Sequence, residues 1–153
     1  MEEGIFKTLE YARTVKMPIA IEPLHPMYAA DRACVNTLKY ALDICESMGA
    51  GIGVAVDVYH TWWDPELESQ IKRAGKERLL AFHLCDWLLE TKHLLLDRGM
   101  MGDGVIDIAL IRKWMEREGF EGLKEVEIFS VDNWWKRDPD EVIRICIERL
   151  AVC

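Results

Sequence analysis

Several features are scarce or absent in this sequence of 153 residues, and each absence excludes a class of protein. No apolar run is long enough to span a bilayer, and the polar first sixteen residues lack the unbroken apolar core of a signal peptide. Lys and Arg form no basic stripe, and the net charge of −8 argues against nonspecific binding to nucleic acid. We therefore expect a cytoplasmic protein with neither a membrane nor a nucleic acid as its partner.

Signatures of nucleotide cofactors and of disulfide frameworks are also missing. No G-x-G-x-x-G motif opens a helix after a strand and no Walker-type motif occurs, so a nicotinamide or ATP cofactor is not expected. The five cysteines are odd in number and form no CxxC pair, which is typical of reduced thiols in a cytosol-like compartment. Half of the residues are apolar, so we expect residues 1–153 to bury a core as a single domain.

What the sequence does contain is a short pattern that occurs four times, an apolar run ending in a residue that can ligate a metal. The closing triplets are Ala20-Ile21-Glu22, Ala55-Val56-Asp57, Ala81-Phe82-His83 and Glu125-Val126-Glu127. Successive side chains of a strand point to opposite faces, so the four closing residues would share one face, at the same point of four strands. Their spacings of 35, 26 and 44 residues leave room for a loop, a crossover helix and a parallel return. The pattern predicts four βα units with their chemistry at the strand ends.

Helices are predicted before the first strand and after each strand. Capping residues and helical spacing predict them over about 2–15, from an Asp31 cap to 48, from Asp64-Pro65 to about Gly75, over 107–118, and from Asp138-Pro139 to the C-terminus. The predicted strands cover about 18–22, 52–57, 78–84 and 123–129. The long connection over 85–106 is expected to be functional or mobile.

This alternation of helices and strands predicts an α/β fold with a parallel sheet and helices outside it. Two architectures remain open, namely a small open sheet covered on both faces and an arc of a (β/α) barrel. Alanine or glutamate precedes each strand-end residue on its own face, whereas strands covered on both faces should be continuous runs of Val, Ile and Leu. The pattern therefore favours the arc.

Functional residues gather at the C-terminal ends of parallel strands, where Glu22, Asp57, His83 and Glu127 are predicted to lie. Three carboxylates and one imidazole suit Mn²⁺ or Mg²⁺ best, and Co²⁺ or Zn²⁺ stays open. The alternative is that each residue is an isolated polar cap of its strand. His60 is expected either to reach back over this site or to be a solvated loop histidine, and Trp62, just beyond a strand end, to wall a pocket or to pack under a loop.

These residues, in this order, resemble the metal-binding pattern of the sugar phosphate isomerase/epimerase superfamily, the xylose isomerase-like TIM barrels. The pattern consists of Glu22, Asp57-x-x-His60, His83 and Glu127, and the runs over 21–26, 56–60 and 99–107 add to the likeness. In that superfamily the four ligands come from strands five to eight of an eight-stranded barrel. The resemblance therefore implies that this chain is the C-terminal half of a TIM (β/α)8 barrel, since a complete one needs about 250 residues.

The resemblance also implies an enzyme of carbohydrate metabolism, an isomerase or epimerase acting on a sugar or sugar phosphate. Glu22, Asp57, His83 and Glu127 would hold the metal, and Glu22 and Glu127 would transfer a proton by way of a metal-stabilised enediolate. His60, Trp62 and Arg98 would bind the substrate, with the Arg98 and Gly102-Asp103-Gly104 loop approaching a hydroxyl or phosphate. Three alternatives remain open: a dehydratase of a cyclitol or sugar acid, an endonuclease relative, which the acidic charge disfavours, and a non-catalytic half-barrel.

Four strands alone would leave two open edges, which invite pairing with another chain. We expect either that two copies form a homodimer around a two-fold axis along the barrel, or that a second polypeptide supplies the other half. A third alternative is that Met1 is an internal start in a truncated reading frame.

Overall fold

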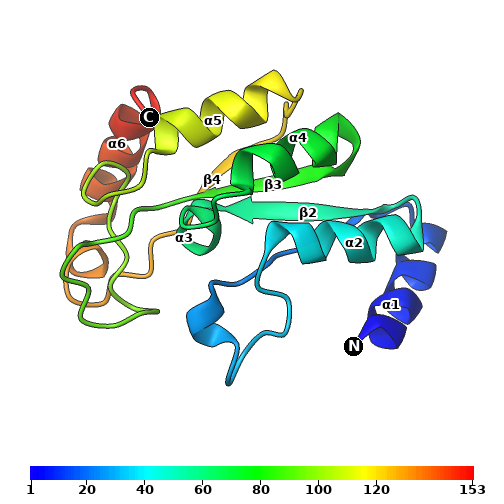
Figure 1. Ribbon diagram of the computed structural model, residues 1–153. Helices are drawn as coiled ribbons and strands as arrows, with labels where there is room; N and C mark the ends of the chain where they lie inside the picture. Colours follow the sequence, from blue (N-terminus) through cyan, green and yellow to red (C-terminus); the bar gives the residue numbers. More distant parts are fainter.

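The computed structural model describes residues 1–153 as an arc of four parallel strands backed by helices (Figure 1). The strands are β1 (Ile19–Ile21), β2 (Ile52–Asp57), β3 (Leu79–Leu84) and β4 (Lys124–Val126). Their order in the sheet is their order in the sequence, and every neighbouring pair is parallel. A doubly wound open sheet would reverse its strand order at a switch point, so the prediction of α/β units arranged as half of a TIM barrel is confirmed.

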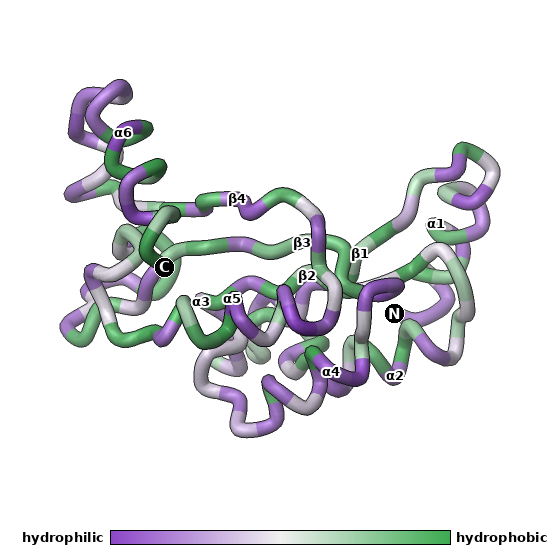
Figure 2. The backbone as a smooth tube through the Cα atoms, turned by 90° about the horizontal axis from the view of Figure 1, so that it is seen from above, coloured by the Kyte–Doolittle hydropathy of each residue, from purple (hydrophilic) through white to green (hydrophobic).

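Six α-helices and two short 3₁₀ turns connect and flank these strands. They are α1 (Glu2–Thr14), α2 (Leu38–Met48), α3 (Val58–Thr61), α4 (Leu67–Arg78), α5 (Ile108–Arg117), α6 (Pro139–Leu150), η1 (Pro26–Tyr28) and η2 (Trp134–Lys136). Figure 2 shows α2, α4 and α5 along one face of the sheet, with α1 and α6 at its two flanks. None of the helices combines the length and the apolar character needed to cross a bilayer.

Two predicted helix starts are confirmed by a capping side chain, and two are wrong. Asp107 and Asp138 accept hydrogen bonds from the first turns of α5 and α6, as predicted. The prediction that Asp31 caps the second helix is wrong, because Thr37 accepts the Tyr40 N–H and the buried face of α2 begins only at Leu38. Asp64-Pro65 does not start α4 either.

The Asp64 carboxylate instead accepts the Glu66 N–H, so it stabilises the turn before α4. The predicted break near Gly75 is present. Gly75 has a φ of 57°, a left-handed conformation that glycine adopts without strain, and the helical turn resumes through Arg78.

The two faces of the sheet differ in chemistry, as the alternation predicted. Side chains such as Val54, Val56, Phe82 and Leu84 point towards the helices and are fully buried in the core. Burying each large apolar side chain contributes about 1.5–3 kcal/mol. The opposite face carries the small or charged positions before each strand end, namely Ala20, Ala55, Ala81 and Glu125. We call this the inner face.

The four strand-end residues are staggered along their strands rather than level, which refines the prediction that they sit at the same point. Asp57 pairs with His83, but the pairing of Ile21 with Val54 sets Glu22 two residues short of Asp57. Glu127 likewise lies two residues beyond Glu125, the partner of His83. Strands tilt in a barrel, so a level plane crosses each successive strand at a later residue. Because each shift is zero or two residues, all four side chains keep to the inner face.

Candidate metal centre

Four potential ligands converge at the carboxyl ends of the strands. Glu22, Asp57, His83 and Glu127 each offer one ligand atom, and these atoms all lie within 4.8 Å of one another. Side chains separated by up to 105 positions of sequence are therefore neighbours in space. Their proposed roles as ligands stay a prediction, but an explanation as unrelated strand caps does not account for this convergence.

Asp57 forms the buried centre of this cluster. It ends β2 and caps α3, since its Oδ1 accepts the Tyr59 N–H at 2.8 Å. Its Oδ2 accepts a hydrogen bond from Arg98 Nη1 at 3.2 Å. Burial raises the pKa of Asp57 to about 7, against the opposing effect of the Arg98 charge. A buried carboxylate of this kind favours a cation beside it.

Glu22 and His83 form an ion pair across the β1 side of the cluster. His83 Nδ1 lies 2.9 Å from Glu22 Oε1. This hydrogen bond raises the pKa of His83 to about 9, so the imidazolium donates to the carboxylate at neutral pH. Burial alone would raise the pKa of Glu22, but the hydrogen bond and charge of His83 outweigh it and the pKa is lowered. An imidazole must be neutral to ligate a metal, so metal binding here would release a proton.

Arg98 lies inside the cluster, not on a distant loop. Its Nη1 donates to Asp57 and, at 2.8 Å, to Glu127 Oε2. The guanidinium is buried between two aromatic rings, 4.3 Å from the centre of Tyr59 and 4.8 Å from that of Phe129. Such cation–π contacts strengthen when the charge is desolvated. Arg98 therefore has a fixed position beside the potential ligands.

His60 is buried against the same cluster, which excludes the alternative of a solvated loop histidine. Its Nδ1 accepts the His25 N–H at 3.2 Å, and its Nε2 lies 3.6 Å from Asp57 Oδ2 and 3.3 Å from Arg98 Nη2. Since Nδ1 accepts, we assign the ring proton to Nε2. Burial, aided by the charge of Arg98, lowers the pKa of His60 to about 3, so the ring is neutral.

Aromatic rings line the loops next to the site, but Trp62 is set back from it. Trp87 stacks on Tyr59 and His25, with ring centres 4.8 and 5.1 Å apart. Trp62 lies 5.9 Å from Trp87 and also faces a cavity of about 130 Å³ between α4 and α5. None of the four potential ligands lines that cavity. Tyr59 is closer to the cluster, because its ring centre lies 4.3 Å from the Arg98 guanidinium, and Trp87 stacks on Tyr59.

Asp86, which the sequence did not single out, organises the second half of the long connection. Its buried carboxylate accepts four backbone N–H groups, from Trp87, Gly102, Gly104 and Ile106, at 2.8 to 3.0 Å. Its main chain also pairs in both directions with Gly99, the neighbour of Arg98. A glycine is required at 104, because a Cβ there would meet the Trp87 carbonyl.

The Asp86 contacts correct the expectation that this glycine loop approaches a hydroxyl or phosphate. The amides of Gly102 and Gly104 already donate to Asp86, so they are not free for an anion. The position of Arg98, by contrast, is fixed by the loop, because its neighbour Gly99 pairs with the main chain of Asp86. The only local signal for Asp86 is a carboxylate two residues after the third strand, followed by several glycines.

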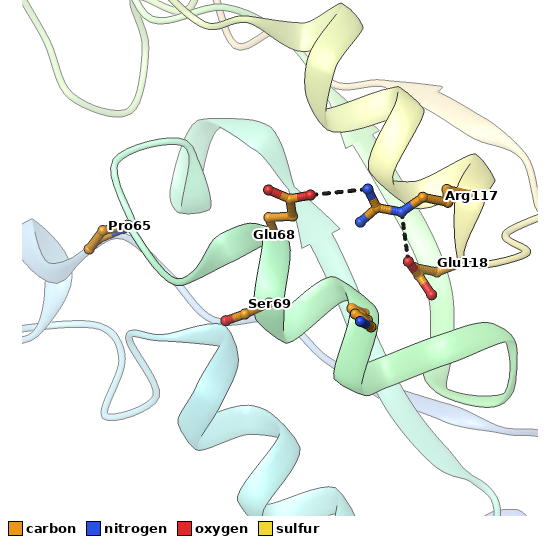
Figure 3. Close-up of a pocket in the computed structure, with 6 residues that line it drawn as sticks. Pro65, Glu68, Ser69, Arg117 and Glu118 are labelled. Atoms are coloured by element: carbon orange, nitrogen blue, oxygen red, sulfur yellow. Dashed lines mark hydrogen bonds and ion pairs between the residues drawn. The ribbon is translucent and has the colours of Figure 1, made fainter.

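A larger cavity lies elsewhere and lacks these features. It measures about 630 Å³ and is lined by Pro65, Glu68, Ser69, Lys72, Arg117 and Glu118 (Figure 3). Arg117 donates to Glu68 at 3.0 Å and to Glu118 at 2.8 Å, so its charge is neutralised. Pro65 is its only apolar lining residue, and no strand-end residue contributes to it. The strand-end cluster is therefore the candidate site.

Comparisons with known proteins concern the fold and the family of this chain. The family model described as xylose isomerase-like TIM barrel matches residues 1–150. A crystal structure of a protein from Sinorhizobium meliloti 1021 is 65% identical with a TM-score of 0.97, over 99% of this chain and 56% of that one. This chain thus spans about half the length of that relative. A search of curated proteins finds no match.

Two more distant structures share the fold. The IOLI protein, solved with a zinc atom, is 21% identical with a TM-score of 0.83, over 98% of this chain and 53% of that one. The 3-keto-D-glucoside 4-epimerase of E. coli is 16% identical with a TM-score of 0.69, over 99% of this chain and 52% of that one. At these identities the likeness shows the fold alone.

Proposed function

The chain belongs to the xylose isomerase-like TIM barrel family, and from this premise we propose that its strand-end cluster is the metal centre of a sugar or sugar phosphate isomerase or epimerase. The observation that carries the proposal is the approach of four ligand atoms, from four separate strand ends, to within 4.8 Å of one another. A zinc atom in one relative and the epimerase name of another support it. Because the chain spans about half of these relatives, the proposed activity is that of the complete barrel.

The donor set fits a divalent cation. Glu22, Asp57 and Glu127 bring three carboxylates to one point, and Arg98 neutralises only part of their charge. Burial makes ionisation of Asp57 costly, and an adjacent metal would offset that cost. Three oxygen ligands and one nitrogen ligand favour Mn²⁺ or Mg²⁺, with Zn²⁺ and Co²⁺ as the alternatives to test.

The residues around the cluster divide into holding and reacting groups. Asp57 and His83, on the central strands, would hold the metal, which when bound supplies Lewis-acid polarisation of a substrate carbonyl. Glu22 and Glu127 lie on the two outer strands and are partly exposed, so a substrate could reach both. We assign them to proton transfer, one removing a proton from the carbon beside the carbonyl and the other returning one.

Substrate oxygens would be oriented by the two buried donors that face the cluster. His60 presents the Nε2 proton and Arg98 its Nη2 group, 3.3 Å apart at one side of Asp57. The neutral state of His60 suits hydrogen bonding to a hydroxyl group. Trp87, stacked on Tyr59 and His25, would form part of the wall that excludes water, with Trp62 packed behind it.

A calorimetric titration of Mn²⁺ into metal-stripped protein tests the metal centre. We expect one ion to bind per chain, and binding to be lost in Asp57→Ala. Asp31→Ala is the matched control, because Asp31 is an exposed aspartate that does not belong to the cluster. Equal binding by the Asp57 and Asp31 variants would refute the metal assignment.

Proton exchange tests the reaction. Incubation of the protein, assembled as a complete barrel, with ketoses and sugar phosphates in D₂O should exchange the acidic proton beside the carbonyl, as followed by NMR. Glu127→Gln should abolish this exchange with the fold intact. Unchanged exchange would remove Glu127 from the proton-transfer pair, and products that have lost water would identify a dehydratase instead.

A further inference from the structure

The cavity between the starts of α4 and α5 is separate from the strand-end cluster and differs from it in chemistry. It measures about 130 Å³, and five apolar side chains and two aspartates line it. Figures 1 and 2 show α4 and α5 as neighbours on the helical face of the sheet. The indoles of Trp62 and Trp114 contribute to the wall. Leu110, which also lines the cavity, is 40% exposed, so this apolar space opens to solvent.

Trp62 brings an unsatisfied hydrogen-bond donor to this cavity. Its Nε1 is buried and has no hydrogen-bond partner within the chain. By comparison, the Nε1 groups of Trp63 and Trp135 donate to main-chain carbonyls at 2.8 and 2.7 Å. A buried donor without an acceptor destabilises a fold, and buried polar groups in native proteins are nearly always satisfied. The Nε1 group of Trp62 therefore favours an acceptor from outside the chain.

Two carboxylates line the same cavity and pair with no cation of this chain. Asp64 and Asp107 each use one oxygen to accept an N–H next to the start of a helix, at 2.8 and 3.0 Å. A helix start carries about half a positive charge, so part of each carboxylate charge stays uncompensated. The arginines of α5, Arg112 and Arg117, pair with glutamates instead. The cavity therefore favours a positive charge, which the indole faces would also attract.

The volume limits the occupant to a molecule of a few heavy atoms, since pockets for drug-sized ligands measure about 300–1,000 Å³. We propose that the cavity binds a small amino alcohol, that is, an aliphatic ammonium ion that also carries a hydroxyl group. The ammonium group would pair with Asp64 and Asp107, and the methylene chain would contact the indoles. The hydroxyl oxygen would accept the Nε1 proton of Trp62. This site is separate from the metal centre, and the proposal does not depend on the proposed enzymatic function.

The NMR signals of the indole N–H groups provide the test. The chain has six tryptophans, and the signal that disappears in Trp62→Phe is that of Trp62. Aminobutanol, butylamine and butanol are titrated separately into isotope-labelled protein in the presence of a chelator. We expect aminobutanol to move the Trp62 signal downfield and to bind at least about fivefold more tightly than the other two, because each lacks one polar contact. An unchanged Trp62 signal, or equal affinities of the three probes, would overturn the proposal.

Two pairs of variants locate the contacts of aminobutanol. Asp107→Asn is compared with Asp138→Asn, because both aspartates cap a helix, asparagine caps equally well, and only Asp107 lines the cavity. Trp62→Phe is compared with Trp135→Phe, which removes an indole donor that already has an acceptor.

Binding to the Trp62 and Trp135 variants is followed at the Trp114 signal. We expect the first variant of each pair to weaken binding at least about threefold, the loss of roughly one polar contact, and its control to leave binding unchanged. Equal effects within each pair would contradict the proposed site. Circular dichroism verifies that every variant is folded.

Discussion

The central strands and the edge strands contribute to the candidate site in different ways. β2 and β3 have six residues each and a neighbour on both sides, whereas β1 and β4 have three residues each and one neighbour. Asp57 at the end of β2 is fully buried, while the side chains of Glu22 and Glu127 at the edges are 33% and 37% exposed. The core of this chain alone thus fixes the centre of the site. The two edge carboxylates are more accessible to solvent than this centre.

The largest expected effect is a difference in stability between a variant in a central strand and a variant in an edge strand, because the central strand is packed more tightly. Phe82 of β3 is fully buried and meets Phe120 edge to face, with ring centres 6.1 Å apart. Phe82→Ala should reduce the free energy of unfolding by about 4 kcal/mol, and Ile21→Ala on the half-buried β1 by about 2 kcal/mol. Urea unfolding measures both. Equal losses would mean that the edge strand is packed as firmly as the centre.

The two ion pairs of Arg98 distinguish the buried centre of the site, at Asp57, from its edge, at Glu127. In chelator, Arg98→Met should cost about 3 kcal/mol of stability, because it leaves the Asp57 carboxylate buried without a cation. Glu127→Gln should cost less than about 1 kcal/mol, since Glu127 is partly exposed and Arg98 keeps Asp57 as its partner. Mn²⁺ at saturation should restore part of the Arg98→Met loss. A larger loss in Glu127→Gln than in Arg98→Met would reverse the comparison.

Asp86 extends the rigid centre into the loop that follows β3. Asp86→Asn should cost about 2 kcal/mol, because an amide group cannot accept all four of the backbone hydrogen bonds that the carboxylate accepts. Hydrogen exchange at the amides of Gly102 and Gly104 should accelerate. Asp103→Asn in the same loop is the control, since Asp103 is partly exposed and accepts weaker contacts. Unchanged exchange in Asp86→Asn would show that the loop is fixed by other contacts.

The smallest effect is a dependence on pH from His60 beside β2. Its pKa of about 3 in the folded protein lies below the ordinary value of 6.5, so below pH 6.5 the unfolded chain binds a proton that the folded chain does not. Stability is therefore lost as the pH falls from 6.5 towards 3. His60→Asn, which keeps an acceptor for the His25 N–H, should remove about 1 kcal/mol of the loss between pH 6.5 and 5.

The control for the His60 prediction is His93→Asn in the exposed loop. Urea unfolding of both variants is compared at pH 7.5 and pH 5. If the two variants show the same dependence as the parent protein, burial of His60 is not the cause of the acid sensitivity.

Features encoded by neighbouring residues were predictable from the sequence. The strand ends at Asp57 and His83 and the helix caps at Asp107 and Asp138 follow from apolar alternation and from short side chains that accept nearby amides. Asp31 was wrongly predicted to cap a helix for the same reason. Aspartate is a common capping residue, but the segment after Asp31 has no buried helical face. The apolar face that decides where α2 begins starts only at Leu38.

Contacts between distant segments were not predictable in this way. Arg98 reaches Asp57 across 41 positions of sequence, and its place depends on the path that Asp86 imposes on the whole connection. The burial of His60 depends in turn on Arg98 and on the His25 backbone. No local pattern distinguishes these side chains from exposed arginines and histidines. Only the folded loop makes them part of the site.

The even stagger of the strand-end residues has a consequence for how such a barrel can evolve. An insertion or deletion of one residue within a strand would turn every later side chain of that strand to the other face, and would exchange a ligand for a core residue. Changes of two residues would only move the ligand along the barrel axis. Lineages of this fold should therefore vary freely in loop length, whereas an odd change in strand length requires a β-bulge, like the register shift of β3 opposite Val54 and Ala55, to keep the ligand on the inner face.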